Sequence, residues 1–140
     1  MVTVFALAGY LATVGCYAPC ASGITANFYA ESSLRPGMVA PSGVGLASWD
    51  GPRRDKLFSA LGSNWIYPTE QMKFMIGELR DMHLLPRIWN ARNPARAAYD
   101  FMKGFERPKA CSRRWCPRSA NPAYRMAVAR AIYASLTRRR

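Results

Sequence analysis

The stretch Ala21-Ser-Gly-Ile-Thr-Ala-Asn-Phe-Tyr-Ala-Glu-Ser32 places an acidic residue at the end of an apolar helical face. In a helix that begins near Pro19, Ile24, Phe28 and Glu31 share one side, because residues three and four apart are neighbours. That placement would bury the carboxyl group and raise the pKa of Glu31, as a general acid requires. Spacing alone nevertheless favours the other interpretation, an exposed glutamate at a helix end.

Prolines mark the starts of four predicted helices. Proline is favoured at the first helical position, since the N–H that it lacks would be unpaired there in any case. Asn93 and Asn121 precede two of these prolines and are expected to be N-caps. The four helices are predicted to run from Pro19 to about Ser32, Pro52 to about Leu61, Pro94 to about Lys103, and Pro122 to about Thr137.

Hydrophobic patterning predicts two further helices. The uncharged run from Val2 to Ala18 lacks a preceding Lys or Arg and is short for a membrane span, so we expect a first core helix rather than a signal peptide or anchor. From Thr69 to Leu84, apolar residues recur every three or four positions, which is typical of an amphipathic helix with a core face. The residues that recur with this spacing are Met72, Met75, Ile76, Leu79 and Met82.

Two regions lack a regular pattern. Leu34 to Gly51 is rich in proline and glycine, yet it contains several large apolar residues, which favours an ordered loop with a short β-hairpin. The second region runs from Arg107 to Asn121.

The composition describes one compact domain with a basic C-terminal third. A chain of 140 residues with six Phe, seven Tyr and four Trp can bury a core and is unlike a disordered tail. The formal net charge is +12, and residues 101–140 hold eleven Lys and Arg against one Glu. Such a surface attracts polyanions, whether nucleic acid, anionic lipid, lipopolysaccharide or anionic wall polymers.

Several ordered motifs resemble the phage tail lysozyme family of peptidoglycan hydrolases. Together they span about residues 10–135. The resemblance implies a single lysozyme-like domain over residues 1–140, mainly α, with about six helices and a long loop or short β-hairpin after the Glu31 helix. The motifs are Asn27-Phe-Tyr-Ala-Glu-Ser-Ser-Leu-Arg-Pro36, Ser42-Gly-Val-Gly-Leu-Ala-Ser-Trp-Asp-Gly-Pro-Arg-Arg54, Glu70-Gln-Met-Lys-Phe-Met-Ile-Gly-Glu-Leu79 and Phe105-Glu-Arg-Pro108.

The resemblance also implies roles for individual residues. Glu31 would protonate the bridging oxygen of the β-1,4 bond between N-acetylmuramic acid and N-acetylglucosamine. The loop would line the cleft, with Trp49 either packing under the loop or forming a platform for a sugar. Family members often carry Gln where Ser48 stands, so Ser48 is expected to replace that amide only in part. The expected substrate-binding residues are Gly45, Leu46, Ser48, Trp49 and Gln71.

A second catalytic carboxylate is not evident, because residues 32–49 contain no Asp or Glu. Typical glycosidases use two carboxylates. Asp50, Asp55 and Glu78 are the candidates, although Asp50 fits an N-cap and Glu78 a structural ion pair. We expect one essential carboxyl, with Ser42 or backbone groups placing the attacking water. If the muramic 6-hydroxyl attacks instead, the enzyme is a lytic transglycosylase, and the sequence leaves both open.

The remaining reactive residues support no cofactor or metal. Cys16, Cys20, Cys111 and Cys116 lack the two-residue spacing typical of zinc knuckles. They allow three disulfide pairings, of which a Cys111–Cys116 bridge would staple the basic loop, and free thiols are the alternative. The single histidine, His83, is interpreted as a charge partner at a helix C-terminus. Glu106 and Arg107 are expected to pair with neighbours and fix a turn.

Two alternatives without catalysis stay open. A non-catalytic module for nucleic acid or membranes would use the mixed cationic and aromatic cluster of Arg113, Arg114, Trp115 and Arg118. A wall-binding adaptor would keep the lysozyme fold without catalysis. On the favoured interpretation, a monomeric free endolysin without a specific nucleic-acid partner is made in the host cytoplasm and acts on peptidoglycan in the periplasm. The basic cluster would then hold it against anionic outer-membrane or wall components.

Overall fold

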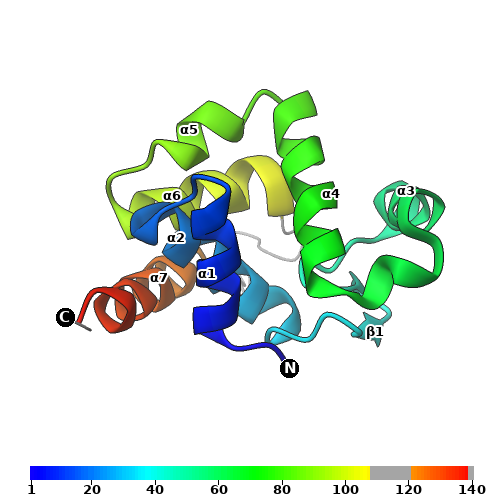
Figure 1. Cartoon of the computed structure of the whole chain (residues 1–140), viewed down its shortest axis with the longest axis horizontal. Helices are drawn as coiled ribbons and strands as arrows, with labels where there is room; N and C mark the ends of the chain where they lie inside the picture. The colour runs from blue at the N-terminus through cyan, green and yellow to red at the C-terminus, as the bar shows by residue number, and fades with distance from the viewer. Residues whose placement is uncertain (108–120, 139–140) are drawn as a thin grey trace.

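The computed structural model describes residues 1–107 and 121–138. Helices make up most of this part of the chain, and a two-stranded hairpin follows the second helix (Figure 1). The elements are α1 (Val4–Thr13), α2 (Ala18–Ser32), β1 (Val39–Ala40), β2 (Gly43–Val44), α3 (Gly51–Leu61), η1 (Gly62–Ile66), α4 (Pro68–Asp81), α5 (Leu85–Trp89), α6 (Pro94–Phe101), η2 (Met102–Glu106) and α7 (Pro122–Thr137).

The proline-marked helices α2, α3, α6 and α7 are confirmed, each with proline in its first turn. Asn93 caps α6 by accepting a hydrogen bond from the backbone N–H of Arg96 at 3.1 Å. Asn121 caps α7 in the same way from Ala123 at 2.8 Å. Asp50 occupies the N-cap position of α3 without a side-chain bond, so its expected capping role is wrong.

The patterned helices are also present, with different ends. α4 buries Met72, Met75 and Leu79, as its spacing predicts. α1 is shorter than the uncharged run that predicts it, and the chain turns at Gly15 before Cys16 and Cys20 join in a disulfide at the start of α2. Within residues 1–107 and 121–138, no helix has both the length and the apolar character to cross a membrane.

The structure adds elements that the sequence analysis does not predict. The described residues form seven α-helices rather than six, because α5 is an additional helix of five residues. So short a helix cannot display a full amphipathic repeat. The helix predicted from Pro94 to Lys103 is α-helical only to Phe101, and continues as the π-helical turn η2 to Glu106.

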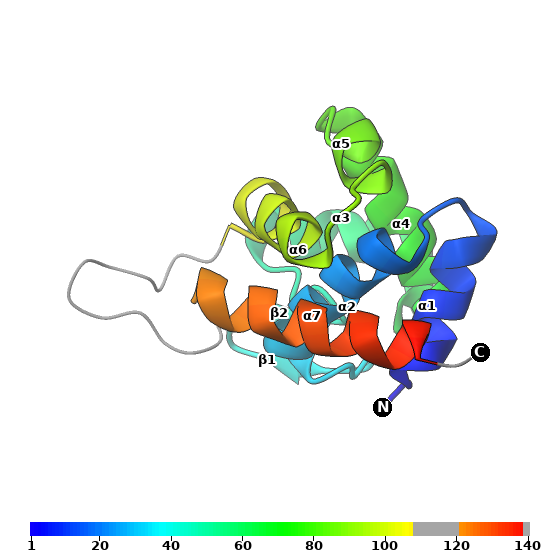
Figure 2. The same cartoon turned by 90° about the vertical axis from the view of Figure 1, so that its left-hand side faces the viewer.

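α2 forms the centre of the core. Figures 1 and 2 show α7 along one side of it and α6 above it, and these three helices pack on one another. Phe28 of α2 meets the ring of Phe101 edge to face, with centroids 5.9 Å apart, and Phe101 stacks on Phe105 at 4.6 Å. α3 and the hairpin lie on the other side of α4 from α6 in Figure 1.

Gly23 sets the distance between α2 and α6. A Cβ atom at this position would lie 2.6 Å from the Cβ of Ala97 and 2.6 Å from the backbone nitrogen of Ala98. We expect Gly23→Ala to lower the free energy of unfolding by about 1–3 kcal/mol, because the two helices must separate. Urea denaturation measures this loss.

Gly9→Ala is the matched control, since Gly9 lies within α1 and a Cβ atom added there would have nothing within 4 Å. Alanine is the better helix former, so this variant should gain up to about 1 kcal/mol. Equal effects of the two substitutions would contradict the close contact at Gly23.

Candidate active site

Glu31 lies in the last turn of α2, where the chain leaves the core for the loop. Ser33 and Leu34 then adopt left-handed backbone conformations that turn the chain toward the hairpin. The Glu31 side chain is 19% exposed, so it is largely buried and still reaches solvent. It therefore has the mixed environment that a proton donor to a bound substrate needs.

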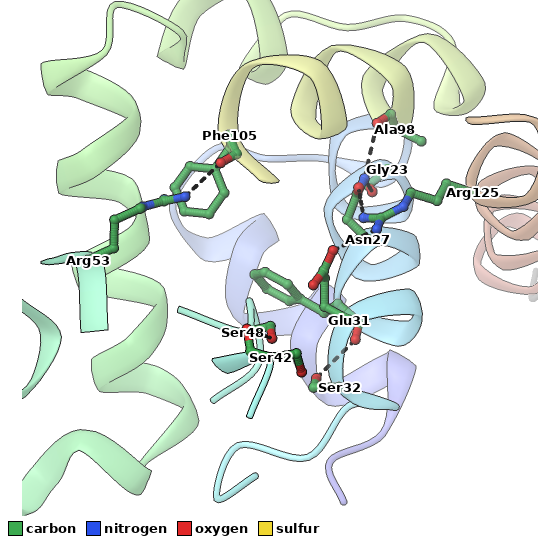
Figure 3. A network of polar contacts seen from close by, with 11 residues as sticks. Gly23, Asn27, Glu31, Ser32, Ser42, Ser48, Arg53, Ala98, Phe105 and Arg125 are labelled. Carbon is green, nitrogen blue, oxygen red and sulfur yellow. Dashed lines mark hydrogen bonds and ion pairs between the residues drawn. The ribbon is translucent and has the colours of Figure 1, made fainter. Parts of the chain in front are cut away.

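A buried arginine from the last helix holds the Glu31 carboxyl group. The Nη2 group of Arg125 donates to Oε2 of Glu31 at 2.6 Å, and its Nη1 group donates to Oδ1 of Asn27 at 2.6 Å. Asn27 in turn donates through Nδ2 to the carbonyls of Gly23 at 2.8 Å and Ala98 at 3.1 Å. This network fixes the carboxyl between α2, α6 and α7 (Figure 3).

Neither Asn27 nor Arg125 is predicted from the sequence to belong to the site. A signal exists in the helical spacing, because Asn27 stands four residues before Glu31 on the same helix. Arg125 carries no such signal, since only the structure shows that it is 1% exposed whereas Arg130, on the same helix, is exposed. An arginine on the buried side of a helix needs an anionic partner, but the sequence does not say which one.

The pKa of Glu31 is raised above its ordinary value, in the direction that the sequence analysis predicts. Burial is the largest cause, whereas the hydrogen bond and charge of Arg125 act in the opposite direction. The charge of Asp50 raises this pKa further, and that of Arg53 lowers it. Glu31 thus keeps a proton to higher pH than an exposed glutamate does.

Gln71, on α4, anchors the loop between α2 and α3. Its Oε1 accepts from the backbone N–H of Leu46 at 2.9 Å, and its Nε2 donates to the carbonyls of Pro36 at 2.7 Å and Trp65 at 2.6 Å. The Gln71 side chain is fully buried, as is that of Leu46. The expected sugar contact of these two side chains is therefore corrected: they stabilise the loop.

Trp49 is a loop anchor and not a sugar platform. It is 1% exposed, its indole N–H donates to Oε1 of Glu78 at 2.7 Å, and its ring meets Phe74 edge to face with centroids 5.8 Å apart. Glu78 also pairs with Arg53 at 3.3 Å, which confirms the structural ion pair expected of it. The substrate-binding assignment of Trp49 is corrected on this ground.

Two serines lie in the loop that follows α2, Ser42 in the turn of the hairpin and Ser48 directly before Trp49. Figure 3 draws both together with Glu31. The hydroxyl of Ser48 donates to the carbonyl oxygen of Ser42 at 3.3 Å. Gly43 permits this approach, because a Cβ there would lie 2.3 Å from the carbonyl oxygen of Ser48. Gly45 has φ +76° and lies buried against Gln71, so it shapes the loop.

Among the other candidate carboxylates, Asp50 is the one that acts on Glu31. It is exposed at the start of α3, and its charge is among those that raise the Glu31 pKa. Asp55 instead borders a shallow hollow with Lys56, Ser59, Ala60 and Phe74. Asp50 is therefore the candidate whose charge contributes to the raised pKa of Glu31.

Glu106 does not form the paired turn that the sequence analysis expects. Its Oε2 atom is buried without a hydrogen-bond partner among the described residues, although the residue as a whole is only half-buried. Burial, and next the charge of Glu31, raise its pKa well above the ordinary value. Arg107 instead donates from Nε to the carbonyl of Gly104 at 2.8 Å.

The other reactive residues lie apart from these contacts or outside the described part. His83 was expected to be a charge partner at a helix C-terminus. It lies two residues after the end of α4, is exposed and has φ +60°. Residues 1–107 and 121–138 contain no cluster of three or more His, Cys, Asp or Glu suited to a metal. Expectations for the Cys111–Cys116 bridge and for the cluster around Arg113, Arg114, Trp115 and Arg118 fall outside the described residues.

The chain matches a known protein family over most of its length. A family model described as phage tail lysozyme matches residues 6–136, which is most of the chain. No curated protein and no solved structure matches significantly. The matched region includes every residue of the Glu31 network described above.

Proposed function

We propose, from the premise that this chain belongs to the phage tail lysozyme family, that it cleaves the β-1,4 bond between N-acetylmuramic acid and N-acetylglucosamine with Glu31 as general acid. The family is one of lysozyme-like peptidoglycan hydrolases, so bacterial peptidoglycan is the substrate class. The observation that carries the proposal is the largely buried Glu31 carboxyl, held by Arg125 at 2.6 Å and retaining partial contact with solvent.

The reaction requires a proton at the moment when the glycosidic bond breaks. The protonated Glu31 carboxyl donates to the bridging oxygen as the bond from that oxygen to the muramic C1 breaks. Positive charge then develops at C1, and the Glu31 carboxylate returns to its pairing with Arg125. The pairing with Arg125 therefore opposes protonation of Glu31 before the reaction and stabilises the Glu31 carboxylate after it. Burial acts in the opposite direction and favours the protonated carboxyl that the reaction needs.

The nucleophile is proposed to be a water molecule on the loop side of Glu31. The exposed Ser42, beside Ser48 in Figure 3, is the proposed group for positioning this water, together with backbone groups of the hairpin. Asp50 adds negative charge near the developing cation. Attack by the muramic 6-hydroxyl is the second candidate, because a site with one well-placed acid serves both reactions.

Mass spectrometry of digested sacculi tests the activity and the reaction type together. Hydrolysis leaves a reducing muramic acid, whereas intramolecular attack leaves a 1,6-anhydro end that is lighter by one water molecule. We expect reducing ends. Anhydro ends alone would assign a lytic transglycosylase, and unchanged sacculi would contradict both reactions.

We propose a free endolysin that is made in the host cytoplasm and acts on the periplasmic wall as a monomer. Its net charge of +12 supports attraction to anionic wall or outer-membrane components.

A further inference from the structure

Four residues form a continuous bridge between the loop after α2 and the turn η2. They are Trp49 at the end of the loop, Glu78 on α4, Arg53 in the first turn of α3 and Phe105 in η2. The four residues come from separate parts of the fold, and their contacts are called the Arg53 bridge below. Figure 3 draws the end of the bridge at which Arg53 meets Phe105.

Arg53 occupies the centre of the bridge and binds a partner on each side. Its Nη2 group pairs with Oε1 of Glu78 at 3.3 Å, and its Nε group donates to Oε2 of Glu78 at 3.4 Å. Its Nη1 group donates to the carbonyl oxygen of Phe105 at 2.8 Å, and the guanidinium carbon lies 4.3 Å from the centre of the Phe105 ring. A planar, forked guanidinium has donors for both partners at once, whereas the compact ammonium of lysine does not.

The loop side of the bridge holds the hairpin. The indole N–H of Trp49 donates to Oε1 of Glu78 at 2.7 Å, the same oxygen that Arg53 contacts. The backbone of Trp49 exchanges two hydrogen bonds with Val44 of β2, at 2.8 and 2.9 Å. Ser42 directly precedes β2. Arg53 therefore acts on the hairpin through Glu78 and Trp49.

The other side of the bridge leads to the helix that carries Glu31. Phe105 is fully buried and stacks on Phe101 with centroids 4.6 Å apart. Phe101 meets Phe28 edge to face at 5.9 Å, and Phe28 lies on α2, three residues before Glu31. Protein interiors are close-packed and little compressible, so this stack of rings gives Arg53 a rigid support on α2. Arg53 thus joins the hairpin to the helix that carries the proposed acid.

We propose that Arg53 is a positioning residue, which holds the hairpin with Ser42 at a fixed place relative to Glu31 so that water, rather than the muramic 6-hydroxyl, attacks C1. This inference rests on the proposed function, in which Glu31 is the acid and Ser42 positions the water. Arg53 acts through Glu78 and Trp49 and takes no part in proton transfer.

The two possible products differ in the nucleophile. In both reactions the bond from C1 to the bridging oxygen breaks, and that oxygen receives the Glu31 proton. In hydrolysis the water oxygen bonds to C1, and one water proton passes to the Glu31 carboxylate. In the intramolecular reaction the 6-hydroxyl oxygen bonds to C1, and its proton passes to the same carboxylate. The 6-hydroxyl belongs to the substrate and needs no placement by the hairpin, whereas the water does.

Arg53→Lys removes the fork and keeps a positive charge. The charge matters because that of Arg53 is among those that lower the pKa of Glu31, and lysine retains it. We expect kcat for hydrolysis of sacculi to fall about tenfold or more, as misplaced reactants do, and the share of 1,6-anhydro ends to rise several-fold. A lower rate with an unchanged ratio of ends would indicate a general loss of structure and overturn the proposal.

Trp49→Phe breaks the same bridge at its loop end without altering Arg53. Phenylalanine keeps a buried aromatic ring and lacks the indole N–H. We expect the same change in the ratio of ends, and no further change in the double variant, because residues that act through one chain of contacts have non-additive effects. Additive changes would contradict a role of Arg53 through Trp49.

Hydrogen exchange at the Trp49 indole tests the bridge without glycan. The chain has four tryptophans, whose ¹⁵N-labelled indole N–H groups can be followed by NMR. We expect exchange at Trp49 to be at least about tenfold faster in Arg53→Lys than in wild type, because Glu78 loses the partner that holds its carboxylate. The Trp89 indole, which donates to the carbonyl of Val14 at 2.9 Å, is the internal control. Unchanged exchange at Trp49, or equal acceleration at Trp89, would overturn the proposal.

Arg54→Lys is the matched control for both measurements. Arg54 follows Arg53 on α3, and its side chain makes no hydrogen bond or ion pair with residues 1–107 and 121–138. This variant should keep the wild-type ratio of ends and the wild-type exchange at Trp49. Intact sacculi after treatment with wild type would refute the proposed activity, whereas faster Trp49 exchange in Arg53→Lys would still support the bridge. Anhydro ends alone from wild type would overturn the placement of water.

Discussion

Glu31→Gln is expected to lower the rate of sacculus digestion by about 10²–10⁴-fold, the range typical for loss of a general acid. Glutamine has nearly the same size, and its amide oxygen can still accept the hydrogen bond from Arg125. It has no proton of suitable acidity for the leaving oxygen. The loss should therefore appear in kcat, with little change in substrate binding, as measured by product release from purified sacculi.

Thermal unfolding of the same protein separates a chemical defect from a folding defect. Glutamine can still accept the hydrogen bond that Arg125 donates to the 19% exposed Glu31 side chain, so this neutral replacement should keep the fold. Glu70→Gln supplies the comparison for an exposed glutamate. Wild-type digestion by Glu31→Gln would remove this residue from the mechanism.

Arg125→Met is expected to lower the free energy of unfolding by about 3 kcal/mol at pH 7, because it leaves Glu31 without its cationic partner and Asn27 without a donor. The effect should shrink toward pH 4, where Glu31 becomes protonated and the unpaired charge disappears. The sign follows from linkage: Arg125 lowers the pKa of Glu31, so its stabilising effect is present above that pKa and is lost as the pH falls through it. Urea denaturation at the two pH values measures the difference.

The same variant should also alter the pH profile of catalysis. Without the arginine, the pKa of Glu31 rises further, so the alkaline limb should extend to higher pH even though the rate falls through poorer positioning. Arg130→Met is the control, because Arg130 is exposed on the same helix. It should change stability by no more than about 0.5 kcal/mol. Equal destabilisation by both substitutions would contradict the buried network.

Local signals predict most of the helices correctly. Prolines and the asparagine caps at positions 93 and 121 act within one helical turn, so their effect is readable without knowing the rest of the fold. The core face of α4 follows from its period alone. α5 and the π-helical end of α6 are missed, since each depends on packing rather than on a repeated pattern.

The site is only partly predictable, because its central contacts join distant parts of the chain. Glu31 is identified as a candidate by the resemblance of its motif to a family, because its place at the end of an apolar helical face also fits an exposed glutamate. Its partner Arg125 lies 94 positions later, and nothing in local spacing links the two. Trp49 and Gln71 illustrate a second difficulty. Tryptophan and glutamine side chains often bind sugars, but they also anchor loops. Only the burial of Trp49 and Gln71 in the structure shows that both anchor the loop in this protein.

The central claim, that Glu31 donates the proton to the leaving oxygen, is tested most directly by changing the leaving group. Wild type and Glu31→Gln would be compared on a soluble glycan fragment whose reducing-end sugar is replaced by 2,4-dinitrophenol. This leaving group departs as a stable anion and needs no proton. We predict that the 10²–10⁴-fold defect of the variant on natural glycan shrinks to within about tenfold on this substrate. An equally large defect on both substrates would contradict the role of Glu31 as general acid.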